Sequence, residues 1–513
     1  MYSDFMNIIN DIESDFPVST WKINNIHIWP ILRFNLFFLN ASLRTSKTRS
    51  IPQNKAFSQK KKLFIENLNG VIQAFQSRRL DISHNDNFLD VDFLFLSQAT
   101  NRNSKIESYW YDRICDPYIT IANELNISSL LLECSPSHQY RTPRYSQSIF
   151  IQDKINICKF KSKLSKKDTI AERISNLDSF YSFKEYIKSK GLKNLPEAKS
   201  LAYQIISIQN MSAYFSKILN HTNPKAGFSV PYYWDIAMAF NLACQQSGIR
   251  SIDIQHGIQS SSHVAYARWN AIPTDGYELL PSYFLCWSNS EVELINQWRD
   301  KKTQNHQPIA IGNLTLEIWL SGRVKAFKNV NSKISNLFQA DNNLIEATTN
   351  ILFTLQPIND PLPDWVIESI QASPKHWKWW MRLHPAMLSQ GDFIEQLLHQ
   401  NDIDNVNLQS ATELPLPALL TNIDVHVTQL SSVVLEADFF NVPSVITDGG
   451  AVQLFPEQIK SSMALLATNP KELIDAITQQ SLKRKKSKAL LCKDRESLIE
   501  EAKKILIDIK KDS

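Results

Sequence analysis

A histidine and a glycine directly follow an apolar run at 251–255 that is typical of a buried strand, in the order Gln255-His256-Gly257. Histidine exchanges protons near neutral pH, and glycine lets the backbone approach a ligand closely. His256 is therefore a candidate general base. Asp253 is a weaker candidate, because the alternation of a strand puts it back inside the strand. The alternative interpretation is a histidine satisfied by a carbonyl group in a tight turn.

The loop after this glycine carries many hydrogen-bonding and aromatic side chains. Among them are His263, Tyr266, Trp269, Asp275, Gly276, Tyr277 and Glu278. Such a mixture suits a sugar-binding surface. The residues predicted to bind a sugar or an acceptor are Gln255, Gly257, His263, Tyr266, Tyr277 and Glu278. Asp275 is a further candidate for the base, and an ordered surface loop without a ligand is an equal alternative.

A second histidine follows the strand predicted at 379–383, in the pair His384-Pro385, with Arg382 just before it. Proline fixes the direction of the chain as it leaves a strand. This arrangement can aim Arg382 and His384 at an anionic group. A strand that simply ends in a proline turn is the alternative.

Hydroxyl side chains open a helix predicted at 431–440, after a strand at 424–428; they are Thr428, Ser431 and Ser432. Free N–H groups at a helix N-terminus bind anions without needing a cation, although Ser431 can also simply cap the helix. Glu436, further along this helix, either accepts hydrogen bonds from a ribose or is a solvated helix residue. The predicted nucleotide-binding set is Arg382, His384, Pro385, Thr428, Ser431, Ser432 and Glu436.

Nothing in the sequence indicates a bound metal or a cofactor. The two DxD strings, at 90–92 and 402–404, fall at the starts of strands, which is the wrong end for a ligand. No HExxH motif, EF-hand loop or Cys/His cluster occurs. We therefore expect no metal ligands.

These candidates need elements that bring several strand ends together. From residue 91 onward, short apolar runs alternate with helical stretches, which indicates parallel α/β sheets. The predicted divisions are an N-terminal helical segment at 1–90, a Rossmann-like acceptor domain at 91–321 with an insertion at about 150–200, a polar linker at 322–345, a Rossmann-like nucleotide-donor domain at 345–480, and a basic segment and helix at 481–513. Open α/β sheets bind ligands beyond the carboxyl ends of their strands, so the cleft between the two domains is the predicted site.

The composition limits the partners and the compartment. The chain has 513 residues, a net charge of +4 and six widely spaced cysteines. The cysteine spacing argues against a disulfide scaffold, and the small charge without a nucleic-acid motif argues against nucleic acid as a partner. The start of the chain lacks the pattern of a secretory signal, and we expect a cytoplasmic protein.

Two segments bear on membrane contact. The apolar segment at 26–39 is too short to span a bilayer and is expected to form a buried helix, with an amphipathic helix at a membrane surface as the alternative. The basic run at 483–488 can bind anionic lipid headgroups, so contact with the surface of the inner membrane is one interpretation. A solvated basic linker is the other.

Taken together, the tandem α/β domains, Gln255-His256-Gly257, His384-Pro385 and the Ser431-Ser432 helix start with Glu436 resemble bacterial GT-B glycosyltransferases of capsule and lipopolysaccharide assembly. The resemblance covers roughly residues 90–475. The His-Pro pair and the Ser-Ser helix start are similar to those of transferases that use CMP-linked sugars such as sialic acid and Kdo. They are also similar to those of CDP-glycerol polymerases of the teichoic-acid type.

This resemblance implies an α/β fold of the GT-B type and a nucleotide-sugar as substrate, with CMP-sugars slightly favoured, and no separate cofactor. It implies that the second domain binds the donor phosphate through His384, Ser431 and Ser432, without a metal. The first domain would bind a glycan or lipid-linked glycan acceptor, with His256 as the base. A CDP-glycerol phosphotransferase, a sugar-nucleotide epimerase or hydrolase, and a non-catalytic scaffold are the alternatives.

Overall fold

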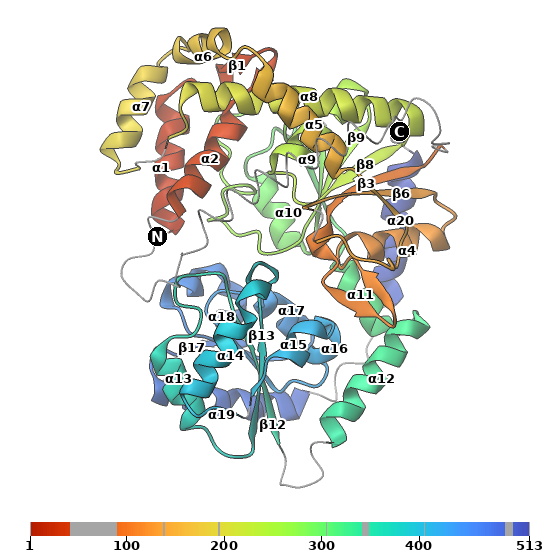
Figure 1. Ribbon diagram of the computed structural model, residues 1–513, viewed down its shortest axis with the longest axis vertical. Helices are drawn as coiled ribbons and strands as arrows, with labels where there is room; N and C mark the ends of the chain where they lie inside the picture. The colour runs from red at the N-terminus through yellow and green to blue at the C-terminus, as the bar shows by residue number, and fades with distance from the viewer. Residues whose placement is uncertain are drawn as a thin grey trace.

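The computed structural model describes residues 2–41, 90–136, 139–192, 195–303, 305–340, 348–404, 406–487 and 496–511. These residues form two α/β domains, one above the other in Figure 1. Each domain contains a parallel sheet with helices packed on its faces. The predicted fold class, two Rossmann-like domains of the GT-B type with extra N-terminal helices, is confirmed.

Within the described residues, the sheet of the first domain has seven strands in the order β11-β10-β9-β8-β3-β6-β7, all parallel. The strands are β3 (Phe93–Gln98), β6 (Ser129–Cys134), β7 (Ser148–Phe150), β8 (Ala226–Ser229), β9 (Arg250–Ile254), β10 (Tyr283–Cys286) and β11 (Gln307–Ala310). Its helices are α4 (Cys115–Glu124), α5 (Gln152–Leu164), α6 (Asp168–Ser175), α7 (Phe180–Ser189), α8 (Ala198–Thr222), α9 (Asp235–Gln246), α10 (Asn289–Asn296) and α11 (Leu314–Ser321). A small hairpin of β4 (Ser104–Ile106) and β5 (Tyr109–Tyr111) follows β3.

The described residues of the second domain form a six-stranded parallel sheet in the order β14-β13-β12-β15-β16-β17. The strands are β12 (Thr349–Thr354), β13 (Trp377–Arg382), β14 (Val406–Asn407), β15 (Val425–Thr428), β16 (Ser444–Ile446) and β17 (Ala464–Leu466). The helices are α13 (Asp364–Gln371), α14 (Gly391–Gln400), α15 (Gln409–Glu413), α16 (Leu416–Leu420), α17 (Val433–Phe439), α18 (Pro456–Lys460) and α19 (Pro470–Ser487). Strands β12 and β15 are buried along their whole length, as expected for the centre of a parallel sheet.

The stretch predicted as a polar linker contains a helix, α12 (Lys325–Ala340), seen at the right of Figure 1. It buries Phe327, Ile334 and Phe338, and the Phe338 ring stacks on Trp380 with 4.2 Å between centroids. These three apolar residues lie on one face of the helix, but in the sequence they are separated by polar residues, so the stretch resembles a linker. The connection between the domains is therefore packed against both.

The last helix, α20 (Glu496–Lys511), returns to the first domain and packs against α4 and α11 (Figure 1). Its apolar face is buried there at Ile499, Ala502 and Leu506. Lys510 forms an ion pair with Asp92 at 3.0 Å, at the start of the first sheet. The end of the chain thus ties back to the first domain.

The predicted N-terminal helical segment is described only over residues 2–41; its remainder, 42–89, lies outside the described residues. Helices α1 (Tyr2–Asp15) and α2 (Trp29–Ala41) flank a short β1–β2 hairpin (Lys22–Ile23 and Ile26–His27). They share one hydrophobic core with α5 to α9. The apolar segment at 26–39 is buried along most of its length, as expected.

The basic run at 483–488 is only partly described, because Lys488 lies outside the described residues. Arg484 is fully buried in α19 and donates a hydrogen bond to the carbonyl oxygen of Phe440 at 2.8 Å. Arg484 therefore does not belong to a lipid-facing surface. No helix among the described residues is long and apolar enough to cross a membrane.

Candidate functional site

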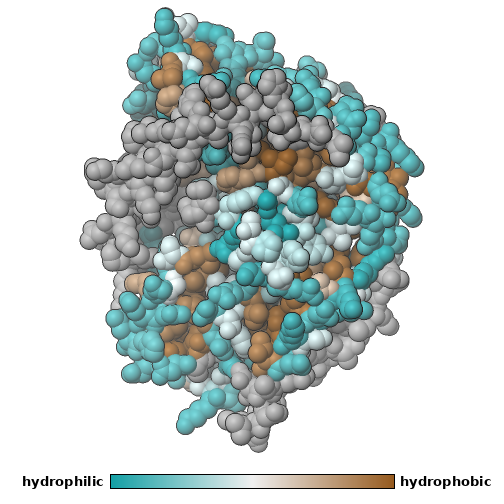
Figure 2. Space-filling model, turned by 45° about the vertical axis from the view of Figure 1, so that its right-hand side comes forward, coloured by the Kyte–Doolittle hydropathy of each residue, from teal (hydrophilic) through white to brown (hydrophobic). Residues whose placement is uncertain are grey.

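A cavity lies between the two domains, where the carboxyl ends of their strands face each other. Its wall on the first domain includes Ser104, Tyr111, Arg113, Tyr118, Gln255, His256, Trp287, Asn313, Thr315 and Trp319. Its wall on the second domain includes Gln356, Arg382, His384, Pro385, Pro415, Leu416, Pro417, Ser431, Ser432, Val433 and Glu436. This is the position that parallel α/β sheets use for ligands. On the face of the molecule seen in Figure 2, brown patches of hydrophobic residues lie among hydrophilic ones around mid-height.

His256 enters this cavity from the end of β9. Its Nε2 lies 3.2 Å from the hydroxyl oxygen of Tyr233, while its Nδ1 is buried with no hydrogen-bond partner among the described residues. Burial, together with the nearby His263 and Arg113, lowers its pKa to about 3. The ring is therefore neutral near pH 7 and has one nitrogen available to a ligand.

His384 enters from the opposite wall, at the end of β13. Its Nδ1 accepts a hydrogen bond from the backbone N–H of Ala386 at 3.1 Å, which caps the short helix η6 (Pro385–Gln390). Burial and the charge of Arg113 lower its pKa to about 4. A neutral ring that accepts at Nδ1 carries its hydrogen on Nε2, so His384 can donate one hydrogen bond to an anion.

Arg382 lines the cavity but is already engaged. One of its Nη atoms donates to the carbonyl oxygens of Ala411 at 2.5 Å and Leu414 at 2.6 Å. Burial and the charge of Arg113 lower its pKa to about 10, although Glu436 acts in the opposite direction. Through this Nη atom Arg382 holds the α15 segment against β13, and it contributes charge to the cavity wall, so its role in binding an anion stays a prediction.

Arg113 is the cation that the sequence analysis missed. It lies between β5 and α4, its side chain is 38% exposed, and its Nη1 lies 4.0 Å from Oε1 of Glu436 on the other domain. Its charge lowers the pKa values of His256, His384 and Arg382. Arg113 is thus an accessible positive charge that acts on both walls of the cavity.

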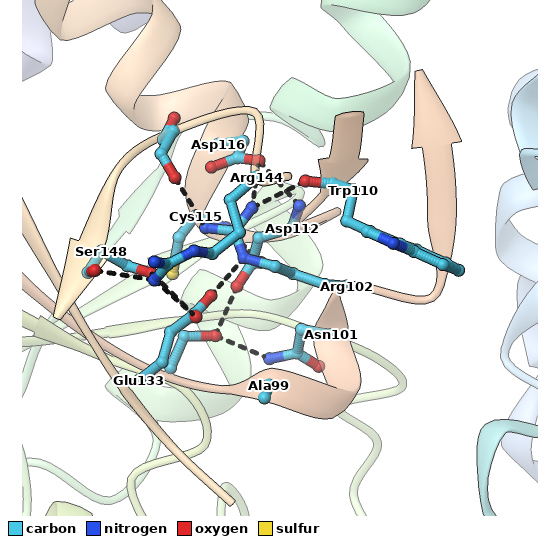
Figure 3. A network of polar contacts seen from close by, with 12 residues as sticks. Ala99, Asn101, Arg102, Trp110, Asp112, Cys115, Asp116, Glu133, Arg144 and Ser148 are labelled. Atoms are coloured by element: carbon cyan, nitrogen blue, oxygen red, sulfur yellow. Dashed lines mark hydrogen bonds and ion pairs between the residues drawn. The ribbon is translucent and has the colours of Figure 1, made fainter. Parts of the chain in front are cut away.

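A buried polar network holds the segment that carries Arg113 (Figure 3). Arg102 bridges Glu133 on β6 and Asp116 on α4, the latter at 3.0 Å. Asp112 accepts the Ser97 hydroxyl at 2.6 Å and caps α4 by accepting the N–H groups of residues 114 and 115. Since Arg113 directly follows Asp112, this network fixes where its side chain starts.

The serines predicted to open a helix lie at the cavity, but the helix is shorter than expected. Helix α17 begins at Val433 and has 7 residues. The Ser431 hydroxyl accepts the N–H of Val433 at 3.2 Å, which is the capping role that the sequence left open. The Thr428 hydroxyl donates to the carbonyl oxygen of Thr354 at 2.9 Å and does not line the cavity. Ser432 therefore remains the hydroxyl best placed for a ligand.

Glu436 is buried in α17 at the cavity. Burial raises its pKa above the usual range, while the charges of Arg113 and Arg382 oppose that shift. Gly257 meets this same helix start, because a Cβ there would lie 3.9 Å from the Ser432 hydroxyl oxygen. The predicted Gln255-His256-Gly257 segment therefore lies directly against the predicted Ser431-Ser432 segment.

Other predicted residues lie away from the cavity. Asp253 is fully buried inside β9, where its carboxylate accepts the Tyr232 N–H and the Tyr266 hydroxyl, both at 2.9 Å. Asp275 is exposed on a loop outside the cavity lining. Neither aspartate is placed to act as the base. The prediction of Asp253 and Asp275 as alternatives to His256 for the general base is therefore not supported by their positions.

The loop predicted to bind a sugar is instead docked onto the N-terminal helices. Arg33 on α2 donates to the carbonyl oxygens of residues 264, 267 and 268, and it pairs with Glu13 on α1. His27 binds the carboxylate of Glu278, with 2.7 Å between Nδ1 and Oε2. Within this loop, Tyr266 and Tyr277 are buried. His263, also predicted to bind a sugar, accepts the Ala265 N–H at 3.1 Å. The cavity lining therefore includes none of the predicted sugar-binding side chains of this loop, which are His263, Tyr266, Tyr277 and Glu278.

Among the residues that the structure describes, no group of three or more His, Cys, Asp or Glu side chains could hold a metal ion. The five described cysteines are all free and buried. The groups that line the cavity include two guanidiniums, of which that of Arg113 is accessible, together with two neutral imidazoles, several hydroxyls and the buried carboxyl group of Glu436. This set can bind an anion and accept a proton.

No protein-family model matches the chain, and no curated protein matches it. Solved structures with a similar fold include the UDP-GlcNAc 2-epimerase of Neisseria meningitidis bound to UDP-GlcNAc, at 12% identity and a TM-score of 0.48, covering 82% of this chain and 100% of that one. The UDP-GlcNAc 2-epimerase of Methanocaldococcus jannaschii, in complex with UDP-GlcNAc and UDP, is 13% identical with a TM-score of 0.45 and covers 81% and 99%. The wall teichoic acid polymerase TagF is 11% identical with a TM-score of 0.45 and covers 87% and 98%.

Proposed function

We propose that this protein is a glycosyltransferase that transfers a sugar from a nucleotide-activated donor to a surface-polysaccharide or lipopolysaccharide acceptor. The observation that carries the proposal is the pairing across one cavity of His256, on the first domain, with His384 and Ser432 on the second. Transfer between two substrates needs a proton acceptor on one side and an anion site on the other. A non-catalytic scaffold has no use for such a pairing.

The donor phosphate would lie between Arg113 and His384. Arg113 supplies a full positive charge, and His384 supplies a hydrogen bond from Nε2. Ser432 adds a hydroxyl. Donors fixed in place before the reaction stabilise charge as it develops on the leaving phosphate, so this set can act without a metal ion.

The nucleoside would extend past Glu436. A buried carboxylate at this position can accept hydrogen bonds from the two ribose hydroxyls. The neighbouring apolar wall of Pro415, Leu416 and Pro417 suits a flat base. A pyrimidine such as cytosine is the base we favour, in line with a CMP-linked sugar as the donor.

In the proposed reaction, an acceptor hydroxyl oxygen attacks the anomeric carbon of the donor sugar. The bond from that carbon to the phosphate oxygen breaks, and its electron pair stays on the phosphate. His256 accepts the proton of the hydroxyl. Burial is the main cause of its low pKa in the free protein, and the charges of His263 and Arg113 add to it. An anionic donor bound to Arg113 would offset the Arg113 part of that shift.

Phosphorus NMR of the full chain with CMP-, CDP-, UDP- and GDP-linked sugars and with CDP-glycerol, with and without a lipid-linked glycan fraction, tests the proposal. We expect one donor to release its nucleotide only when the acceptor fraction is present, and EDTA to leave the rate unchanged. Conversion of a donor without any acceptor would indicate an epimerase or hydrolase. Release of CMP from CDP-glycerol would indicate a phosphotransferase, and no turnover of any donor would contradict the proposal.

A further inference from the structure

A second cavity lies in the first domain, behind the wall that carries His256. It is lined by Ile31, Phe34, Asn35, Phe38, Gln98, Lys159, Gln204, Pro231, Tyr233, Trp234, Asp235, Ile236 and Met238. We call it the aromatic groove. The predicted N-terminal segment and the predicted insertion meet here, because α2 belongs to the first and Lys159 on α5 belongs to the second. These additions to a Rossmann-like domain thus build one site.

Three aromatic rings form one side of the aromatic groove. The Tyr233 ring centroid lies 5.6 Å from that of Phe34 and 6.2 Å from that of Phe38, with both pairs tilted. Phe38 is 51% exposed although it is a large apolar side chain. Aromatic faces left open beside polar groups are typical of ligand sites. The groove therefore offers a flat apolar surface to a bound molecule.

A fixed relay of polar side chains lies beside these rings. Asn35 donates to Gln204 at 2.9 Å, and Gln204 donates to Asp235 at 2.8 Å. The relay uses the amide N–H of Asn35, both polar atoms of the Gln204 amide and one oxygen of Asp235. The Asn35 carbonyl oxygen and the second Asp235 oxygen take no part in the relay and can accept hydrogen bonds from a ligand. The indole N–H of Trp234 is buried with no hydrogen-bond partner among the described residues. Both donors and acceptors are thus available around the rings.

This combination matches the chemistry of a sugar ring. A pyranose presents a face of C–H groups, which packs on aromatic rings, and an edge of hydroxyls, which pair with amides and carboxylates. An aliphatic chain would leave the polar relay unsatisfied. The single lining cation, Lys159, is too little charge for a nucleic-acid backbone.

Tyr233 connects the aromatic groove to His256, which lines the cavity between the domains. Its ring lines the aromatic groove, and its hydroxyl oxygen lies 3.2 Å from Nε2 of His256. A sugar on this ring would stand next to the proposed base. We propose that the aromatic groove binds a saccharide unit of the acceptor, held on Tyr233 and Phe38 and oriented by the Asn35–Gln204–Asp235 relay.

Because this proposal rests on the proposed function, its test must be separable from donor binding. The full chain is applied to an array of immobilised bacterial surface oligosaccharides, and binding is compared with that of Phe38→Ala, Tyr233→Phe and the control Tyr181→Ala. Tyr181 is an equally large aromatic, 73% exposed on α7, and lines neither cavity. Thermal unfolding of each variant checks that it is folded, and nucleotide binding is measured in parallel.

We expect the wild-type chain and Tyr181→Ala to bind the same oligosaccharides. Phe38→Ala should weaken that binding by about tenfold, because it removes an exposed ring, while nucleotide binding stays unchanged. Tyr233→Phe should keep the binding, since the ring remains. An array on which the wild-type chain binds nothing, or binding that Phe38→Ala leaves intact, would overturn the groove proposal even if a nucleotide binds. A wild-type chain that binds the oligosaccharides but no nucleotide would count against the proposed function and not against the groove proposal.

Discussion

Arg113 on the first domain and Glu436 on the second face each other across the cavity between the domains, with 4.0 Å between Nη1 and Oε1. The pair is too long for a hydrogen bond, and Arg113 is still accessible while Glu436 is buried. The guanidinium is therefore held near the carboxylate and is still free to receive an anion. This makes Arg113 the residue on which donor binding should depend most.

Replacing Arg113 with Gln should weaken nucleotide binding by roughly 10- to 100-fold, because a charge-assisted hydrogen bond to phosphate is lost. Calorimetric titration of the variant measures the change. The control is Arg173→Gln, which alters an exposed arginine on α6 that bonds Asn24 far from the cavity lining. Equal affinities of wild type and Arg113→Gln would remove Arg113 from the donor site.

Replacing His256 with Ala should leave nucleotide affinity within about twofold and lower the transfer rate by at least about 100-fold. The reason is that His256 is proposed to contact the acceptor, whereas Arg113, His384 and Ser432 are the groups proposed to hold the donor phosphate. Initial rates at saturating donor provide the measurement. Tyr233→Phe is the matched comparison, because it removes only the hydroxyl beside Nε2. Full transfer activity in His256→Ala would exclude it as the base.

Asp253 should behave as a structural acid. Burial raises its pKa to about 8, against the hydrogen bonds from Tyr266 and Tyr232 that lower it. An unfolded chain releases this proton near pH 4, so the folded state holds it over the window from about 4 to 8. In that window the stabilisation from this group is lost as pH rises, by up to about 1.4 kcal/mol per pH unit.

The Asp253→Asn variant lacks this titration, and its amide can imitate the neutral acid. The free energy of unfolding of wild type should therefore fall relative to the variant between pH 5 and about 8. Urea unfolding at several pH values measures the difference. Transfer activity should be retained. A parallel pH dependence in the two proteins, or an inactive but stable variant, would contradict this assignment.

Arg33 should be a major stabilising residue of the N-terminal helices. It is fully buried, pairs with Glu13, donates to the 264–268 loop and lies 4.1 Å above the Trp269 ring. Arg33→Ala leaves the Glu13 carboxylate buried without its partner, which typically costs about 3 to 5 kcal/mol. Urea unfolding gives the value. A loss below 1 kcal/mol, on the order of a surface ion pair, would show that this contact does not hold the loop.

The residues that directly follow the strands are the part of the candidate site that can be predicted from the sequence. His256, His384 and Ser432 each follow an apolar run, and parallel strands bring such positions to one edge of a sheet. The two-domain fold followed from the same alternation. In both cases the pattern is local, so a single sequence contains it.

The misplaced residues depend on contacts that are distant along the chain. Tyr277 and Glu278 look suited to a sugar until the N-terminal segment, more than 230 residues earlier, covers their loop through contacts such as that of His27 on β2 with Glu278. Arg113 was missed for the same reason. It follows a short hairpin rather than a core strand, and the Arg102–Asp112–Asp116 network, formed by residues on either side of it, holds its segment at the cavity.

The central claim is that the cavity between the domains binds a nucleotide through His384. Thermal unfolding of wild type and His384→Ala with CMP, CDP, UDP and GDP tests it most directly. We predict that at least one nucleotide raises the midpoint of wild type and that His384→Ala loses this response without a change in its own midpoint. No response of wild type to any of the four, or an equal response in His384→Ala, would contradict the account.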